Sequence, residues 1–290
     1  MEVALGLISA LCWGMTDFLG GPAARRVGVR HAVFATNAVG FIALLLVLAL
    51  AHDAREKLLS GQLQGIAAAL AAAVLLLCAT LTLSTALKSG KAAIVAPIAM
   101  SYGVVTTALS MLSGEPIHGA QLIGIAICII GVPLTGMASE DKQQANPSRH
   151  KPLVSVALAS CAMVCFGTSY WLQGRFAIKA IGTVGTLSVN YAFATCVLGL
   201  GLILFKRKDE GEPPAIRYAI VFAQASFSLL ALATFSWGLS IGHTSTLSVL
   251  STLSGAVTAL LGFAFRGEVL NRTQWLGVAT VVVGAGVVRW

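Results

Sequence analysis

The feature that most constrains this chain is an internal repeat. Six positions recur 153 residues later in one register, and in the first copy they are Gly114, Glu115, Gln121, Gly124, Ala126 and Gly131. Gly14 and Gly167 are separated by the same distance, as are Asn37 and Asn190. A repeat with a fixed period indicates structural units of one kind. We therefore predict two related halves, residues 1–138 and 153–290, joined by the polar linker 139–152.

The composition predicts that both halves lie in a lipid bilayer. Hydrophobic residues make up 57% of the 290 positions and charged residues 10%, whereas soluble proteins carry about 25% charged residues. Ten apolar segments approach the roughly 20 residues that a helix needs to cross a membrane. Their predicted ranges are 3–21, 31–51, 64–86, 92–112, 118–137, 153–174, 183–205, 216–239, 244–265 and 273–289. The sequence thus predicts an all-α integral membrane protein with ten transmembrane helices.

Each half holds five predicted spans, which is an odd number. The second half must therefore enter the membrane in the opposite sense to the first. Such inverted repeats are typical of transporters, in which the substrate site lies between the repeats near the middle of the bilayer. The pattern favours transport of a small-molecule substrate.

The basic charge indicates orientation in the membrane rather than nucleic-acid binding. The net charge is +8, but the Lys and Arg residues lie mainly in short connections, where they orient membrane proteins. Fourteen of the 19 lie in odd-numbered connections. This bias predicts that the odd-numbered connections, the linker included, face the cytoplasmic side of a cell (inner) membrane.

The cysteines do not indicate a metal or cofactor site. All six lie in apolar segments, and none has the spacing of a metal-binding motif. We expect no cofactor, no metal and no disulfide framework. No phosphate-cradling loop is apparent either, so ATP coupling is not indicated.

Several motifs resemble the drug/metabolite transporter superfamily, in its EamA-type branch. They are Trp13-Gly14 and Phe166-Gly167 in the first span of each half, Pro97 before Gly114-Glu115 in the fourth, and the Gln-x-x-Gly starts at Gln121 and Gln274 in the fifth. Val249 stands where the repeat would place a second proline, so a hinge role for Pro97 is confined to the first half. The resemblance implies two five-helix bundles, with spans 1, 3, 4, 6, 8 and 9 around a central cavity. It also implies export of amino acids or similar metabolites.

Asp17 is the acidic residue that lies well inside an apolar span. A carboxylate at membrane depth is costly unless it faces protein or a water-filled cavity. Two interpretations stay open. The carboxylate could carry protons or pair with a substrate amine, or it could lie near the membrane interface and pair with Arg25 or Arg26.

The other candidate substrate-binding residues are aromatic or neutral polar side chains at membrane depth. With Asp17, they are Trp13, Ser101, Tyr102, Phe166, Tyr170, Gln224, Trp237 and Ser251. Hydroxyl-rich or unwound helix segments recur at transporter sites. The alternative is that the hydroxyls bond to carbonyls of their own helices in ordinary small-residue packing. Asn37 and Asn190, which repeat between the halves, are expected to be structural.

These features predict a secondary transporter that exports small metabolites, with amino acids as the expected substrates, by alternating access. We expect it to act as a monomer without enzyme activity, and protons stay open as a coupling partner. Two other classes remain open. A structural or assembly protein of the membrane would form a dry bundle, and an intramembrane enzyme would need a convergent acid–base set, for which Asp17 and His243 are a thin basis.

Overall fold

The structure is a computed structural model, and its described part is helical with short turns. It describes residues 2–27, 29–89, 98–115, 119–136, 152–204, 215–241, 244–266 and 272–288, and these ranges contain no β-strand. The helices of the first part are α1 (Glu2–Val27), α2 (Val29–Leu50), α3 (His52–Leu59), α4 (Leu63–Ser89), α6 (Tyr102–Leu112) and α7 (Gly119–Gly136). Those of the second part are α8 (Pro152–Leu172), the π-helical turn η2 (Gln173–Ala177), α9 (Ile178–Leu204), α10 (Ala215–Ile241), α11 (Thr244–Ser251), α12 (Ser254–Arg266) and α13 (Arg272–Val288).

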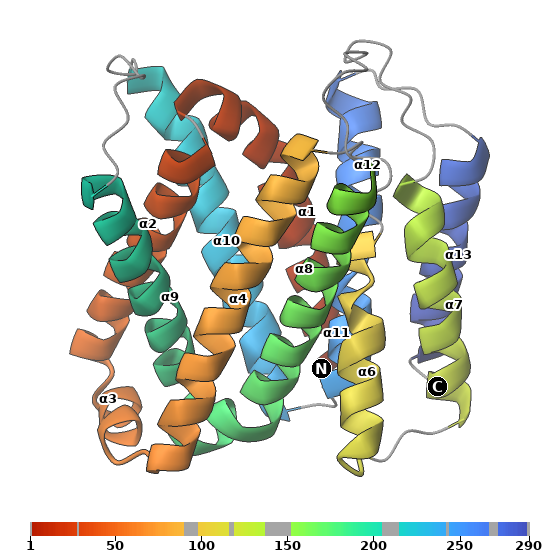
Figure 1. Cartoon of the computed structure of the whole chain (residues 1–290). Coiled ribbons are helices and arrows are strands. Elements are labelled where there is room, and N and C mark those ends of the chain that lie inside the picture. Colours follow the sequence, from red (N-terminus) through yellow and green to blue (C-terminus); the bar gives the residue numbers. More distant parts are fainter. Residues whose placement is uncertain are drawn as a thin grey trace.

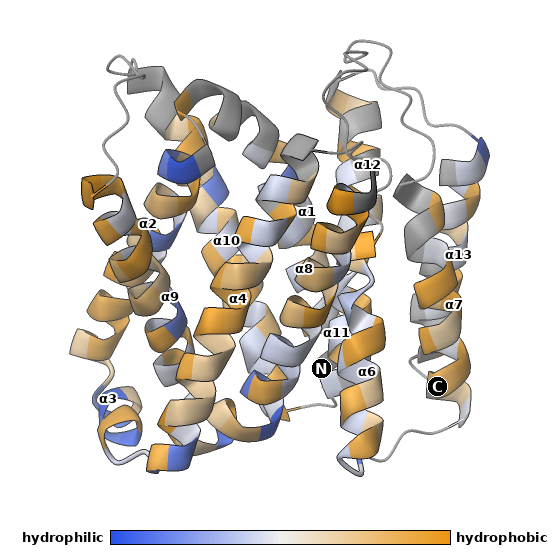
Figure 2. Cartoon of the chain, viewed as in Figure 1, coloured by the Kyte–Doolittle hydropathy of each residue, from blue (hydrophilic) through white to orange (hydrophobic). Residues whose placement is uncertain are grey.

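The helices form a multi-pass membrane bundle. Within the described residues, five stretches are long and apolar enough to cross a bilayer: Val3–Gly20, Arg30–Leu50, Leu63–Leu83, Val154–Leu204 and Ala219–Ile241. Three shorter apolar stretches are Ile98–Leu112, Leu122–Gly131 and Thr246–Thr258. Apolar residues occupy much of the length of several helices (Figure 2), and Leu46, Ile130 and Phe222 are about 60% exposed. A soluble monomer rarely exposes apolar surface on this scale, so we conclude that lipid covers these faces.

Two predicted spans are not separated by the expected loop. The ranges 153–174 and 183–205 belong to one helical run that passes through α8, η2 and α9. The direction changes inside α9 at Gly182, whose φ of 74° is a conformation that side-chain-bearing residues rarely adopt. Glycine therefore allows a sharp bend without a polar connection.

The predicted span 244–265 is interrupted. α11 ends at Ser251 and α12 begins at Ser254, with a turn between them. Thr252 Oγ1 donates a hydrogen bond to the Val249 carbonyl at 2.7 Å. Such side-chain bonds compete with the helical backbone pattern, which explains why the hydroxyl-rich segment does not continue as one helix. In the predicted span 92–112, residues 92–97, including Pro97, lie outside the described residues.

The helices of the two predicted halves interleave. α1 packs on α10, α11 and α12, while α8 packs on α4 and α6. α2 lies against α9, and α7 lies beside α13 at one edge of the bundle (Figure 1). If the first and second halves are exchanged, the pair α1–α10 becomes α8–α4, and α2–α9 and α7–α13 are unchanged. An approximate two-fold axis between the halves would produce this reciprocity.

Two hydrogen bonds at the helix crossings follow the same exchange. Thr258 Oγ1 shares its hydrogen between the Gly14 carbonyl at 3.2 Å and the Ser254 carbonyl of its own helix at 2.9 Å. Thr106 Oγ1 likewise shares its hydrogen between the Gly167 carbonyl at 3.1 Å and the Tyr102 carbonyl of its own helix at 3.2 Å. Gly14 corresponds to Gly167 in the sequence repeat, and Thr106 corresponds to Thr258 at an offset of 152. We call these two bonds the reciprocal glycine contacts. Each one joins the first half to the second.

Glycine is required at both crossings by close packing. A Cβ atom on Gly167 would lie 2.6 Å from Val105 Cβ, and a Cβ atom on Gly14 would overlap the side chain of Val257. Val105 and Val257 are themselves repeat equivalents at the offset of 152. In lipid, helix association depends on this kind of close approach and on interhelical hydrogen bonds rather than on the hydrophobic effect.

Gly14→Ala and Gly167→Ala should each destabilise the protein. Overpacking at a tight site costs about 1–3 kcal/mol, so we expect both variants to unfold at lower denaturant than wild type in mixed micelles. Gly201→Ala is the matched control, because a Cβ there meets nothing within 4 Å. Equal unfolding midpoints for all three variants would contradict the tight crossings.

Candidate functional site

Five aromatic side chains meet at the centre of the bundle. They come from α1, α6, α8 and α10 and are Trp13, Tyr102, Phe166, Tyr170 and Phe235. The ring centroid of Tyr170 lies 4.8 Å from that of Phe235, 5.2 Å from that of Tyr102 and 5.8 Å from that of Trp13. These separations are typical of favourable aromatic pairs. We call the five side chains the aromatic cluster, and its three members Tyr102, Tyr170 and Phe235 are at most 4% exposed.

A buried hydrogen bond ties the aromatic cluster to α11. The Tyr102 hydroxyl and Ser251 Oγ are 2.8 Å apart. Ser251 also donates to the Ser248 carbonyl at 2.8 Å, so its single hydrogen is engaged there and Tyr102 is the donor in the pair. Two predicted site residues from different halves are thereby brought together.

Asp17 lies at an accessible end of the aromatic cluster. The residue is exposed, and its carboxylate is near enough to Tyr102 and Tyr170 to act on their hydroxyl groups through its charge. Both tyrosines are buried, whereas the residue Asp17 keeps exposed surface, so Asp17 lies at the edge of the aromatic cluster. Asp17 follows Trp13 by one helical turn on α1, which places the two on the same helix face.

Gln224 approaches α1 on the same side of the aromatic cluster as Asp17. Its Nε2 lies 3.2 Å from the position that a Cβ on Gly20 would occupy, and Gly20 is one turn beyond Asp17. Its Oε1 is buried and has no hydrogen-bond partner among the described residues. A buried amide oxygen without a partner is costly, so this atom is available to accept a hydrogen bond from a ligand.

The structure does not bring Trp237 to the aromatic cluster. Trp237 is 54% exposed on the outer side of α10. Phe235, two residues earlier and therefore on the opposite side of the helix, packs against Trp13 and Tyr170 instead. Phe235 was not among the predicted site residues. Its spacing of eleven residues from Gln224, about three helical turns, was the signal that could have identified it.

The remaining predictions fall at or beyond the edge of the described chain. Ser101 is half-buried in the turn before α6, and its backbone N–H donates to the Ile98 carbonyl at 3.2 Å. Pro97 lies outside the described residues, and so do the side chains of Arg25 and Arg26. The proposed hinge and the alternative ion pair of Asp17 therefore stay predictions.

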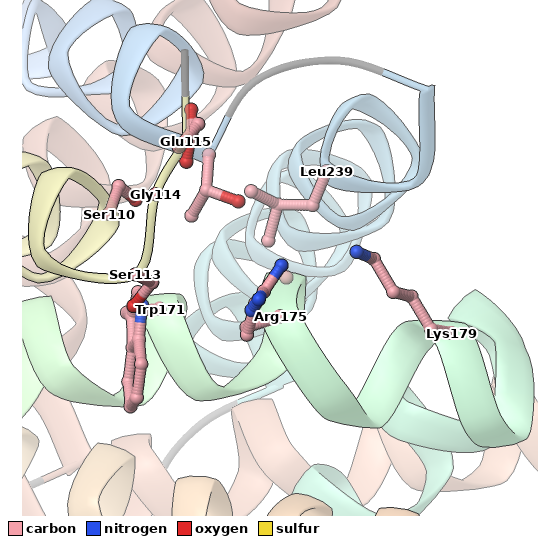
Figure 3. A pocket seen from close by; sticks show the side chains of 10 residues that line it. Ser110, Ser113, Gly114, Glu115, Trp171, Arg175, Lys179 and Leu239 are labelled. Carbon is pink, nitrogen blue, oxygen red and sulfur yellow. Dashed lines mark hydrogen bonds between the residues drawn. The ribbon is translucent and has the colours of Figure 1, made fainter. Parts of the chain in front are cut away.

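A pocket of about 220 Å³ lies at the other end of the aromatic cluster. Its walls come from α6, α8, η2, α10 and the starts of α9 and α11, and the lining residues are Ser110, Ser113, Gly114, Glu115, Trp171, Gly174, Arg175, Lys179, Leu239 and Thr244. Arg175 and Lys179 extend into it (Figure 3). Leu239 follows Phe235 by one turn on α10, and Gly174 follows Tyr170 by four residues along α8 and η2. The aromatic cluster thus separates Asp17 from this pocket.

A polar network next to the pocket was only partly expected. Asn190 Nδ2 donates to Gln173 Oε1 at 3.1 Å, Gln173 Nε2 donates to Ser169 Oγ at 3.1 Å, and Ser169 Oγ donates to the Ala72 carbonyl at 2.8 Å. Asn190 was predicted to be structural, and this network fits that role. Asn37 instead donates to the Val33 carbonyl of its own helix at 2.8 Å.

Comparisons with known proteins identify the family and the fold of the chain. The profile of the EamA-like transporter family matches residues 1–137 and 153–290. An uncharacterized protein of Methanocaldococcus jannaschii is 30% identical over 138 residues, which are 47% of this chain and 97% of that protein. A solved crystal structure superposes with a TM-score of 0.80 at 18% identity over 99% of this chain and 95% of that chain, which establishes similarity of fold alone.

The fold and the two profile matches define a multi-pass membrane transporter of the drug/metabolite type. The chain belongs to the EamA-like transporter family, which confirms the family that the sequence motifs resemble. As a transporter, it would bind a small-molecule substrate within a lipid bilayer.

Asp17→Cys in a cysteine-free background should react with a charged, water-soluble thiol reagent. Ser251→Cys should stay inert because Ser251 is fully buried beneath Tyr102. Leu230→Cys is the control for lipid exposure: it is 50% exposed on α10 and should react with a membrane-soluble maleimide only. An Asp17→Cys variant as inert as Ser251→Cys would mean that no open end exists there.

Proposed function

We propose that the protein is a secondary transporter that exports small metabolites, with amino acids as the substrate class, by alternating access between its two halves. The observation that carries the proposal is Asp17: an accessible carboxylate next to buried aromatic rings at the junction of helices from both predicted halves. A carboxylate is suited to pair with an amine, and aromatic rings are suited to apolar side chains. Membership of the transporter family supports the same conclusion.

The proposed route runs through the aromatic cluster. In the structure the buried rings of Tyr102, Tyr170 and Phe235 lie between Asp17 and the pocket. A solute that enters at Asp17 would have to displace these rings before it reached the pocket. We infer that the two halves, as an inverted repeat, rock about the reciprocal glycine contacts and open one end at a time. The exchange-symmetric packing of α1, α4, α8 and α10 supports this inference.

Gln224 would act beside Asp17. Its unpartnered Oε1 can accept a hydrogen bond from a substrate amine, while the Asp17 carboxylate neutralises the charge of that amine. Tyr102 and Ser251, by contrast, satisfy each other across α6 and α11. We therefore assign Asp17 and Gln224 to substrate recognition, and Tyr102 and Ser251 to closure of the route.

Asp17→Asn should remove the effect of a pH gradient on transport if protons drive the export. The neutral amide keeps the shape of the carboxylate but cannot carry a proton. Uptake of radiolabelled amino acids into inside-out vesicles, with and without the gradient, measures this. Glu56→Gln is the control, because Glu56 is an exposed acid on α3 outside the bundle. Full gradient-driven uptake by Asp17→Asn would exclude Asp17 from coupling. No uptake of any amino acid by the wild type would contradict amino acids as the substrate class.

The Lys and Arg distribution leads us to propose a cell (inner) membrane location with the odd-numbered connections in the cytoplasm. A reporter that is active only in the cytoplasm should work when it is inserted near Asn146 in the linker. The same reporter fused after Trp290 should be inactive. The reverse pattern would show that the orientation is wrong, without affecting the proposed substrate site.

A further inference from the structure

The pocket at the end of the bundle remote from Asp17 has an excess of positive charge. Arg175 and Lys179 both extend into it, and Glu115 lies on the opposite wall (Figure 3). In the part of the chain that the structure describes, neither cation takes part in an ion pair, whereas Glu115 already has an interaction of its own. Two cations that share a confined space with one acid favour an anionic ligand.

A buried hydroxyl in the wall of the pocket also has no partner. Ser110 is 1% exposed, and its Oγ makes no hydrogen bond in the described part of the chain. Its neighbour Ser113 is fully engaged, because it donates to the Leu109 carbonyl at 2.6 Å and accepts from Trp171 Nε1 at 3.1 Å. Ser110 is thus a buried hydroxyl donor in the wall that a ligand could engage, and an unmade hydrogen bond at a buried group is costly.

The cations project from an element that the structure holds firmly. Arg175 lies within the π-helical turn η2, and π turns inside α-helices are frequent at functional sites. Gln173 in the same turn is fully buried and bonded to both Ser169 and Asn190. Gly174 lets the start of α11 approach, since a Cβ there would lie 2.5 Å from Thr244 Oγ1. The backbone that carries Arg175 is therefore preorganised.

We propose that this pocket is a binding site for a small oxyanion group, a carboxylate or phosphate, with Arg175 and Lys179 as its charged ligands and Ser110 as a hydroxyl donor. Trp171 and Leu239 supply an apolar wall for the rest of the ligand. The site is separate from Asp17 and does not depend on amino acids being the transported substrate. The same chemistry fits a free metabolite anion and an anionic lipid headgroup.

Line broadening of the ³¹P resonance of inorganic phosphate and of the ¹³C carboxylate resonance of acetate tests the site. The full chain is placed in nanodiscs of neutral phosphatidylcholine. We expect broadening of both resonances with the wild type. With Arg175→Gln/Lys179→Gln we expect the affinity for both anions to fall by about tenfold or more, because charge-assisted hydrogen bonds are lost. Arg55→Gln/Lys57→Gln is the matched control: it removes the same charge from α3, outside the pocket.

Three further measurements complete the test. Glu115→Gln should bind phosphate more tightly than wild type, because a like charge is removed from the opposite wall. Arg175→Lys should retain part of the binding, which separates loss of charge from loss of folding. In nanodiscs that contain phosphatidylglycerol, loss of the broadening would assign the site to a lipid headgroup, and unchanged broadening would assign it to a soluble anion. Equal broadening for the Arg175/Lys179 and Arg55/Lys57 double variants, or none with wild type, would overturn the proposal.

Discussion

The close crossings at Gly14 and Gly167 are the constraint on which the rest of the structure depends. Lipid gives no hydrophobic reason for two helices to associate, so the halves must be joined by close packing and interhelical hydrogen bonds. The reciprocal glycine contacts supply both, once in each direction. They also explain the aromatic-Gly pairs: each glycine touches the other half, and the preceding residue, Trp13 or Phe166, is turned about 100° around the helix into the aromatic cluster.

This geometry gives the bundle a closed middle and two polar ends. At one end Asp17 and Gln224 offer a carboxylate and an unpartnered amide oxygen. At the other end Arg175 and Lys179 face a pocket of about 220 Å³. The two ends have opposite charge. In our proposal, a substrate amine pairs with Asp17 at one end, and an oxyanion group binds independently in the pocket at the other end.

Features of the structure that depend on sequence periodicity and composition could be predicted from the sequence. The helical class and the family followed from apolar runs and from motifs at one offset. Local irregularities in the helices could not be predicted. The break after Ser251 depends on how hydroxyls bond to nearby carbonyls, and the bend at Gly182 depends on one backbone torsion angle. Phe235 and Trp237 are both aromatic residues in the same apolar segment, so the sequence does not distinguish them. In the structure, helix packing buries Phe235 and leaves Trp237 exposed. The pocket is lined by three segments that are distant in the sequence, residues 110–115, 171–179 and 239–244. A pattern within one segment therefore could not predict it.

Alternating access requires that the two ends of the bundle open in turn about the reciprocal glycine contacts. Spin labels at Arg30 and Val154 report across the halves at the Asp17 end, and labels at Leu112 and Ser240 report across them at the pocket end; all four residues are exposed. Double electron–electron resonance would give both distance distributions with and without a saturating transported amino acid. We predict that one distance lengthens as the other shortens. Two distances that stay fixed, or that change in the same direction, would contradict alternating access in this protein.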